Sequence, residues 1–215
     1  MFALGGQVRD CSILQTRPEI KVKQAIRKYI GWALHDANIK CRPGAIPVYT
    51  IHAQKKGESV VAAVSRLNRH LETLCKRYHE ALGISSLEQL QTPHQGLQSS
   101  SDGITVKHEP EDSSSDQFHR YCPLLVGFII CGPIVAILTL DTDPLSPKDW
   151  AGGDAGSKFI SQFDVGERGQ DVWTSLAVAI TTMHIRQTMV RLAENAKGGF
   201  YRSIGGVSYA SDEDL

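Results

Sequence analysis

The sequence predicts an α+β fold with a small, mainly antiparallel sheet, three major helices and a long disordered insertion. Apolar residues recur at helical spacing in two segments of the first half of the chain and in one segment near its end. Residues 121–140 contain no formally charged side chain and are divided by Gly132-Pro133, which favours paired strands. Residues 84–118 are dominated by Ser, Gln, Pro, Asp and Glu, and cannot bury enough apolar surface to offset chain entropy.

The first predicted helix covers residues 18–38, where apolar residues alternate with Lys and Arg in an amphipathic pattern with a basic outer face. Pro43 and Gly44 end this region. Residues 46–53 then form a short β-rich run. Pro47 favours an edge position for this strand, because proline cannot donate a hydrogen bond to a neighbouring strand.

The second predicted helix covers residues 58–82, and Gly83 supplies its C-terminal stop. Its apolar residues fall along one face, which we expect to be buried: Val60, Val61, Val64, Leu67, Leu71, Leu74, Cys75, Tyr78 and Leu82.

Residues 121–140 allow two interpretations. Twenty uncharged residues are long enough to cross a bilayer, so a single membrane span is one alternative. The break at Gly132-Pro133, the many β-branched residues and the arrival of Asp141 and Asp143 favour a buried hairpin of two strands.

Residues 144–169 are rich in Pro, Gly and Asp and are expected to form a loop anchored by Trp150, Phe159 and Phe163. A long helix is predicted from about residue 170 to residue 196. Its first half is apolar nearly all round, so we expect Trp173, Leu176 and Ile180 to lie in the core.

These elements suggest four regions. Residues 1–83 form a basic helix-strand-helix half, and residues 84–118 form a disordered, acidic and Ser-rich linker. Residues 119–200 form a hairpin plus a long helix, which we expect to share one core with residues 1–83. Residues 201–215 form an acidic tail. Residues 1–90 carry 14 Lys and Arg against 7 Asp and Glu, whereas residues 91–215 carry 9 against 16. The basic half could face nucleic acid, but the net charge of zero favours an interaction with the acidic half or with solvent.

The cysteine pattern indicates free thiols in a reducing compartment. The chain has five cysteines, an odd number with no Cys-x-x-Cys pair. The first residues lack the basic and apolar regions of a secretory signal, so a cytoplasmic or nuclear location is expected.

One short segment resembles the SUMO-acceptor pattern of an aliphatic residue, Lys, any residue and Glu. It is Val106-Lys107-His108-Glu109, followed by acidic residues and by Ser113, Ser114 and Ser115. The resemblance implies Lys107 as the acceptor and these serines as phosphorylation sites that would add charge. The alternative is a solvated linker without modification.

The candidate metal site consists of Asp141 and Asp143 at the end of the predicted hairpin, and the favoured alternative is a pair of solvated acids that end the strand. Alternate residues of a strand project to the same side, and carboxylate oxygens suit Mg²⁺ or Mn²⁺. This pattern is similar to the opening motif of haloacid-dehalogenase phosphatases, although the downstream Lys and acidic motif of that family is missing. The hairpin, with a Gly at its turn, also resembles that of restriction-endonuclease-like domains of fungal proteins. The acid pair and Glu-x-Lys of that family are missing from a convincing strand, which implies an inactive or an unrelated domain.

A zinc site is a further candidate, from Cys75 and His79 one helical turn apart together with His119 and Cys122. The alternative is a core thiol with surface histidines. The motifs of serine hydrolases, P-loop enzymes, dinucleotide-binding folds and zinc proteases are missing from the sequence.

The favoured interpretation is a non-enzymatic intracellular interaction or regulatory protein with a protein partner and without a cofactor, controlled by modification of its linker. One alternative is a metal-dependent phosphoryl-transfer or nuclease-like enzyme that uses Asp141 and Asp143. The other is a single-pass membrane protein spanning residues 121–140.

Overall fold

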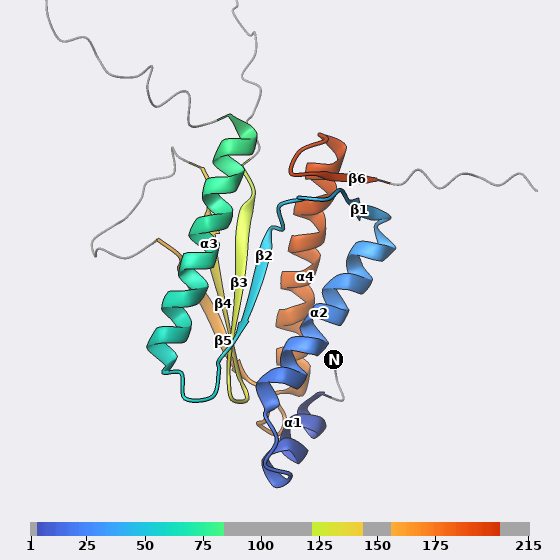
Figure 1. Cartoon of the computed structure of the whole chain (residues 1–215). Coiled ribbons are helices and arrows are strands. Elements are labelled where there is room, and N and C mark those ends of the chain that lie inside the picture. Colours follow the sequence, from blue (N-terminus) through green and yellow to red (C-terminus); the bar gives the residue numbers. More distant parts are fainter. Residues whose placement is uncertain (1–3, 84–121, 144–155, 203–215) are drawn as a thin grey trace, which may run out of the picture.

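The structure is a computed structural model that describes residues 4–83, 122–143 and 156–202 (Figure 1). Its helices are α1 (Leu4–Ile13), α2 (Pro18–Asp36), α3 (Val60–Leu82) and α4 (Asp171–Glu194). Its strands are β1 (Ile39–Cys41), β2 (Tyr49–Ala53), β3 (Leu124–Cys131), β4 (Ile134–Asp141), β5 (Lys158–Asp164) and β6 (Phe200–Arg202). The α+β prediction is confirmed, whereas the predicted linker 84–118 and residues 203–215 of the predicted tail lie outside the described residues.

A four-stranded sheet in the order β2-β3-β4-β5 forms the centre of the fold. β2 runs parallel to β3, whereas β3, β4 and β5 are successively antiparallel. The predicted edge strand at 46–53 is confirmed in its second half, because β2 begins two residues after Pro47 and lies at the edge. β1 and β6 pair in a separate two-stranded sheet that the sequence did not lead us to expect.

β3 and β4 form the predicted hairpin. Cys131 pairs with Ile134, so Gly132 and Pro133 make a two-residue turn, and Gly132 has a φ of 59°. This left-handed conformation suits glycine, which has no Cβ to clash. The alternative of a helical membrane span over 121–140 is wrong, because Leu124–Cys131 and Ile134–Asp141 form two strands. No helix in the described ranges has the length and apolar character needed to cross a membrane.

Helices cover both faces of the sheet: α3 lies on one face, and α2 and α4 lie on the other (Figure 1). On the α3 face, Gly127 leaves room for two leucines, because a Cβ at this position would lie 3.0 Å from Leu71 and 3.1 Å from Leu67. Successive residues of a strand alternate between faces, so Val126 and Phe128 point toward the other layer. Because both faces of β3 are covered, its interior positions are apolar throughout.

α3 agrees with the second predicted helix. The hydroxyl of Ser59 accepts a hydrogen bond from the Ala62 N–H at 3.1 Å, and Gly83 ends the helix in the left-handed conformation. Val60 and Val61 are exposed, contrary to the prediction, because they lie in the first turn and the buried face of the helix begins only at Ala63.

Two elements correct the sequence-based expectations. Residues 4–13 form α1, and the expected loop 144–169 contains β5, which pairs with β4. The pairing skips Ile160, which produces a bulge at this edge of the sheet. Phe159 is exposed and therefore anchors no loop, Phe163 is half-buried, and Trp150 lies outside the described residues.

Candidate interaction surface on helix α4

The buried face of α4 carries an unusual number of hydroxyl groups. Thr174, Ser175, Thr182 and Thr188 all point into the protein and are at most 7% exposed. The side-chain oxygens of Thr174 and Thr182 find no hydrogen-bond partner within the described part of the chain. Because a buried hydroxyl without a partner is destabilising, this face is a poorer apolar surface than a core helix normally offers.

The solvent face of the first half of α4 is apolar. Val172, Trp173, Leu176, Ile180 and Met183 are between 39% and 64% exposed, and we call these five residues the α4 patch. Their positions recur at three- and four-residue intervals, which places them in one stripe along the helix. The prediction that Trp173, Leu176 and Ile180 lie in the core is therefore wrong.

The second half of α4 explains this orientation. Ile185, Met189 and Leu192 point inward and are nearly inaccessible, whereas Gln187 and Arg191 point outward. Since a helix rotates as a rigid unit, this amphipathic half fixes which side of the first half faces solvent. The first half carries its large apolar residues on the solvent face and three hydroxyl residues on the buried face, so its own sequence does not favour this orientation.

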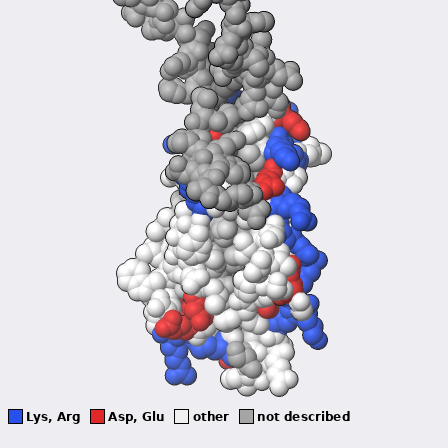
Figure 2. All heavy atoms as spheres, turned by 90° about the vertical axis from the view of Figure 1, so that its left-hand side faces the viewer, with Lys and Arg blue, Asp and Glu red and all other residues white. Residues whose placement is uncertain are grey.

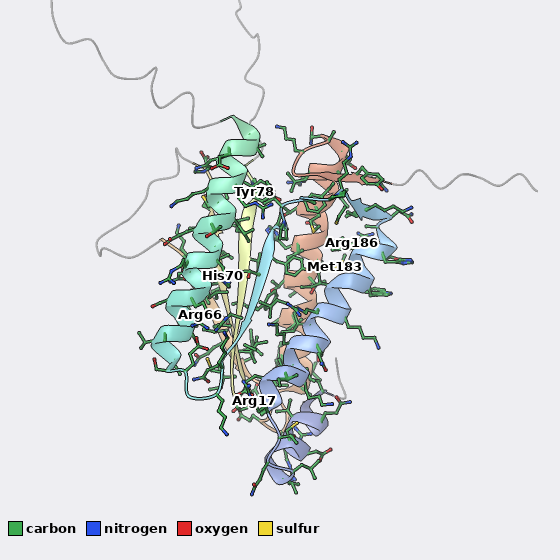
Figure 3. All side chains as sticks on the ribbon, in the orientation of Figure 1. Arg17, Arg66, His70, Tyr78, Met183 and Arg186 are labelled. Carbon is green, nitrogen blue, oxygen red and sulfur yellow. The ribbon has the colours of Figure 1, made fainter. Side chains whose placement is uncertain are left out.

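The neighbouring helix α2 lies beside α4 and carries an exposed indole, that of Trp32. An Arg186 Nη atom lies 3.2 Å from a carboxylate oxygen of Asp36, which joins α4 to the end of α2. The two helices run in the same direction, and Met183 and Arg186 lie beside α2 (Figures 1 and 3). Met183 lies one turn before Arg186, and the exposed Trp32 lies one turn before Asp36. Trp32 is therefore at about the level of Met183 along the two helices.

The α4 patch has the area of the largest apolar patch on a typical monomer, and no charged side chain interrupts it. At the observed exposures its five side chains present on the order of 500 Å², near the upper end of the roughly 300–600 Å² of the largest patch on a typical monomer. No Lys, Arg, Asp or Glu occurs between residues 172 and 183. Charges of both signs stand at its two ends along the chain, with Glu167 and Arg168 before it and Arg191 and Glu194 after it.

The other side of the molecule has a different character. Figure 2 looks onto the α3 side and shows Lys and Arg gathered along one side of the view, with a largely uncharged area below the centre. On α3 itself, exposed Arg69, Lys76 and Arg77 are interspersed with Glu72 and Glu80. On α3, therefore, charges of both signs alternate.

Asp141 and Asp143 are brought together, but only by the local turn. The N–H of Asp143 donates to a carboxylate oxygen of Asp141 at 2.9 Å. Between them, Thr142 is buried and donates from its hydroxyl to the Pro123 carbonyl at 2.7 Å. Within the described ranges, no group of three His, Cys, Asp or Glu residues is placed to hold a metal ion.

The Cys75–His79 pair serves as a structural contact. The Cys75 Sγ lies 3.6 Å from His79 Nε2, and the same nitrogen lies 2.8 Å from the Thr142 carbonyl oxygen. Because a carbonyl can only accept, His79 Nε2 is the donor, and it joins the end of α3 to the end of β4. His119, the third zinc candidate, lies outside the described residues, as do Lys107, Ser113, Ser114 and Ser115.

A buried carboxylate closes the turn between β2 and α3, and the sequence reasoning missed it. Glu58 accepts a hydrogen bond from the Lys55 N–H at 2.7 Å and lies 3.2 Å from both His52 and Arg66. Arg66 and His70 project from α3 toward this turn (Figure 3). The Lys55 N–H, followed by His52 and Arg66, lowers the pKa of Glu58 against the opposing effect of burial. The arrangement holds the turn rather than a ligand.

A hollow at the base of β5 is too small to suggest a substrate site. Its volume is about 250 Å³, and its lining includes Ile134, Phe163, Asp164 and Glu167. Pockets for small molecules usually span about 300–1,000 Å³ and are mostly apolar. The α4 patch is therefore the stronger functional candidate in the described part of the chain.

Comparisons with protein-family models, with curated proteins and with solved structures found no match to this chain.

Proposed function

We propose that this chain is a non-enzymatic interaction protein that binds a partner protein through the α4 patch. The single observation that carries the proposal is the character of the first half of α4: its large apolar side chains face solvent, while the hydroxyl residues Thr174, Ser175 and Thr182 are buried. An apolar patch at the upper end of the range found on monomers is often functional.

Energetics support a binding role for the patch. Covering about 500 Å² of apolar surface at about 25 cal/mol per Å² contributes on the order of 10 kcal/mol before association costs. Association itself costs about 4–15 kcal/mol, so the patch suits a reversible contact. Trp173 provides the kind of large, rigid anchor that dominates interface energies.

The proposal includes control of this contact by modification of the linker, at Lys107 or at Ser113, Ser114 and Ser115. A phosphate group adds about −1.5 to −2 charges at neutral pH, and charge changes of this size alter protein contacts. The cytoplasmic or nuclear location also stays a prediction.

Site-specific photo-crosslinking tests the function. A photoreactive phenylalanine analogue in place of Ile180 should crosslink to a protein in the cells that make the chain, because this side chain is 62% exposed at the centre of the patch. The same analogue in place of Lys76, which is exposed on α3, is the control and should give no comparable adduct. Equal crosslinking at both positions, or none at position 180, would refute the proposal.

A further inference from the structure

We propose that the free edge of β2 binds an acidic, extended peptide segment of another protein, which adds a strand to the sheet. The proposal goes beyond the proposed function, because it concerns a different surface from the α4 patch. Three observations support it: the main-chain groups of β2 that point away from the sheet, the regularity of this edge, and the basic side chains of the two helices that flank it.

β2 directs main-chain hydrogen-bonding groups away from the sheet. The Gln54 N–H donates to the Ile130 carbonyl at 2.8 Å, which identifies the even-numbered residues of this strand as those that bond to β3. Because alternate residues of a strand turn their main-chain groups to opposite sides, three residues face the free edge: Tyr49, Ile51 and Ala53. Within the described ranges, these outward groups take part in no main-chain hydrogen bond. Such a row is a template for a further strand.

The two edges of the sheet differ in how they are protected. β5 carries Lys158 and Asp164, and its pairing skips Ile160; charges and bulges both hinder the addition of a strand. β2 contains no Lys, Arg, Asp or Glu and pairs with β3 without a shift of register. Figure 1 shows β2 between α3 and α2 with no helix or strand in front of it. The β2 edge is therefore the one that suits an added strand.

Helix α3 presents basic side chains to this edge. Arg66, His70 and Arg77 recur at intervals of four and seven residues, which places them on one side of the helix. Arg66 and His70 project toward β2 (Figure 3), and the His70 ring lies 6.5 Å from the ring of His52 in β2. Arg77 donates to the Gly44 carbonyl at 3.2 Å, in the segment that leads to β2. One flank of the edge is therefore basic over most of its length.

Helix α2 supplies two cations to the other flank. Lys23 and Arg27 lie one turn apart, and neither forms an ion pair with a described residue. Arg27 lies near Tyr49 of β2: burial raises the pKa of Tyr49, and Arg27 opposes this rise. Burial lowers the pKa of Lys23, and the charge of Arg27 lowers it further. Because like charges one turn apart repel each other, an anionic partner would stabilise this pair.

The acidic side chains of this region are already engaged. Glu58 lies 3.2 Å from both His52 and Arg66, and Glu19 lies 3.6 Å from Arg17. Figure 2 is turned so that the β2 side of the molecule lies on the right, and Lys and Arg gather along that margin. We call this surface the cationic edge, which consists of β2 with Lys23, Arg27, Arg66, His70 and Arg77.

A peptide fits the cationic edge better than a nucleic acid. The outward N–H and C=O groups of β2 match the donors and acceptors of another main chain, which a nucleic acid does not offer in this spacing. Single-stranded nucleic acids also stack on exposed aromatic rings, whereas Tyr49 is half-buried. Glu and Asp side chains on the peptide would complement the flanking charges and give specificity. The structure therefore favours an acidic peptide of about five extended residues.

Fluorescence anisotropy of a labelled peptide with the full chain tests the addition of a strand. The probe is a peptide of alternating Glu and Thr, because Thr favours the extended conformation. Its control carries a methyl group on every main-chain nitrogen, which prevents strand pairing and keeps all charges. We expect the control to bind at least about tenfold more weakly than the probe. Equal binding of the two peptides would overturn strand addition, and failure of the probe to bind would refute the proposal.

Two neighbouring charge reversals on α2 test the location. Arg27 faces β2, whereas Lys28 is exposed 100° further round the helix and faces away from β2. Arg27→Glu should weaken binding of the probe at least about tenfold, as should Lys23→Glu, and Lys28→Glu should leave the affinity nearly unchanged. Circular dichroism and thermal unfolding establish that the variants are folded. Equal losses for Arg27→Glu and Lys28→Glu would exclude the cationic edge as the site.

Hydrogen exchange of the full chain with bound probe tests the main-chain contact. The amides of Ile51 and Ala53 should exchange more slowly than in the free chain, whereas the Thr50 amide, which faces β3, should not change. Protection elsewhere without a change at Ile51 would overturn the proposal. A single-stranded oligonucleotide that binds through Arg27 where the probe does not would overturn the peptide in favour of nucleic acid. The α4 patch takes no part in these measurements, so their failure would leave the proposed function standing.

Discussion

Replacing Thr182 by Val should stabilise the protein, which is an unusual result for a fully buried position. Thr182 is 0% exposed, and its hydroxyl has no hydrogen-bond partner in the described part of the chain. Valine has nearly the same shape and a similar helix propensity, so neither packing nor backbone preference opposes the change.

The magnitude follows from two contributions. A buried hydroxyl without a partner costs about 1–3 kcal/mol, which the substitution removes. The added methyl group contributes about 0.8 kcal/mol of apolar burial. Allowing for imperfect packing, we expect the free energy of unfolding to rise by about 1–2 kcal/mol, and the melting temperature by a few degrees.

Urea unfolding of Thr182→Val against Thr181→Val tests this reasoning. The hydroxyl of Thr181, the next residue, donates to the Ala177 carbonyl at 2.8 Å, so its removal should bring no gain. If Thr182→Val lowers the free energy of unfolding, or if both variants gain equally, the hydroxyl of Thr182 is satisfied and the description of the buried face is wrong.

Three further predictions concern stability. Ile185→Ala should lower the free energy of unfolding by about 2–5 kcal/mol because Ile185 is fully buried, whereas Leu176→Ala, in the α4 patch, should lower it by under about 1 kcal/mol. Urea unfolding of the monomer compares the two variants. Equal losses would contradict the orientation of α4. The lowered pKa of Glu58 stabilises the fold above the ordinary glutamate pKa of 4.5, and this stabilisation is lost as the pH falls from 4.5 through the lower pKa of the folded state. Glu58→Gln should therefore flatten the fall in the free energy of unfolding over this pH range, whereas the exposed Glu80→Gln should not. Millimolar Mg²⁺ or Mn²⁺ should leave the melting temperature unchanged, and a rise that Asp141→Asn abolishes would favour the metal-dependent enzyme instead.

The sequence correctly predicts those helices and strands whose hydrophobic periodicity agrees with the residues that mark their ends. α3 has a clear apolar stripe, a Ser cap and a terminal glycine, and the β3–β4 hairpin has a Gly-Pro break between two strand-length runs. β5 has neither signal, because an edge strand with a bulge exposes both of its faces and needs no strict alternation. The expected loop of more than 20 residues was itself an argument for a missing element, since such loops are uncommon in compact domains.

The candidate site could be predicted only in part. The apolar content of the first half of α4 was visible, but the sequence favours burial of its large apolar residues, whereas the structure buries its hydroxyl residues instead. The amphipathic second half, with Ile185 and Met189 inward and Arg191 outward, contained the missing information. The pairing of Arg186 with Asp36, which places Trp32 at about the level of Met183, joins residues far apart in the chain and has no local signal.

The parallel pairing of β2 with β3 has a consequence for the order of folding during synthesis. It joins Tyr49 to Val126, 77 positions apart, whereas the β3–β4 hairpin joins residues between 3 and 17 positions apart. Local contacts form first, so the hairpin should appear before β2 docks on it. At that moment both faces of the hairpin are apolar and prone to aggregation. On the ribosome, however, α2 and α3 have already emerged, so a helix for each face is available before the hairpin is complete.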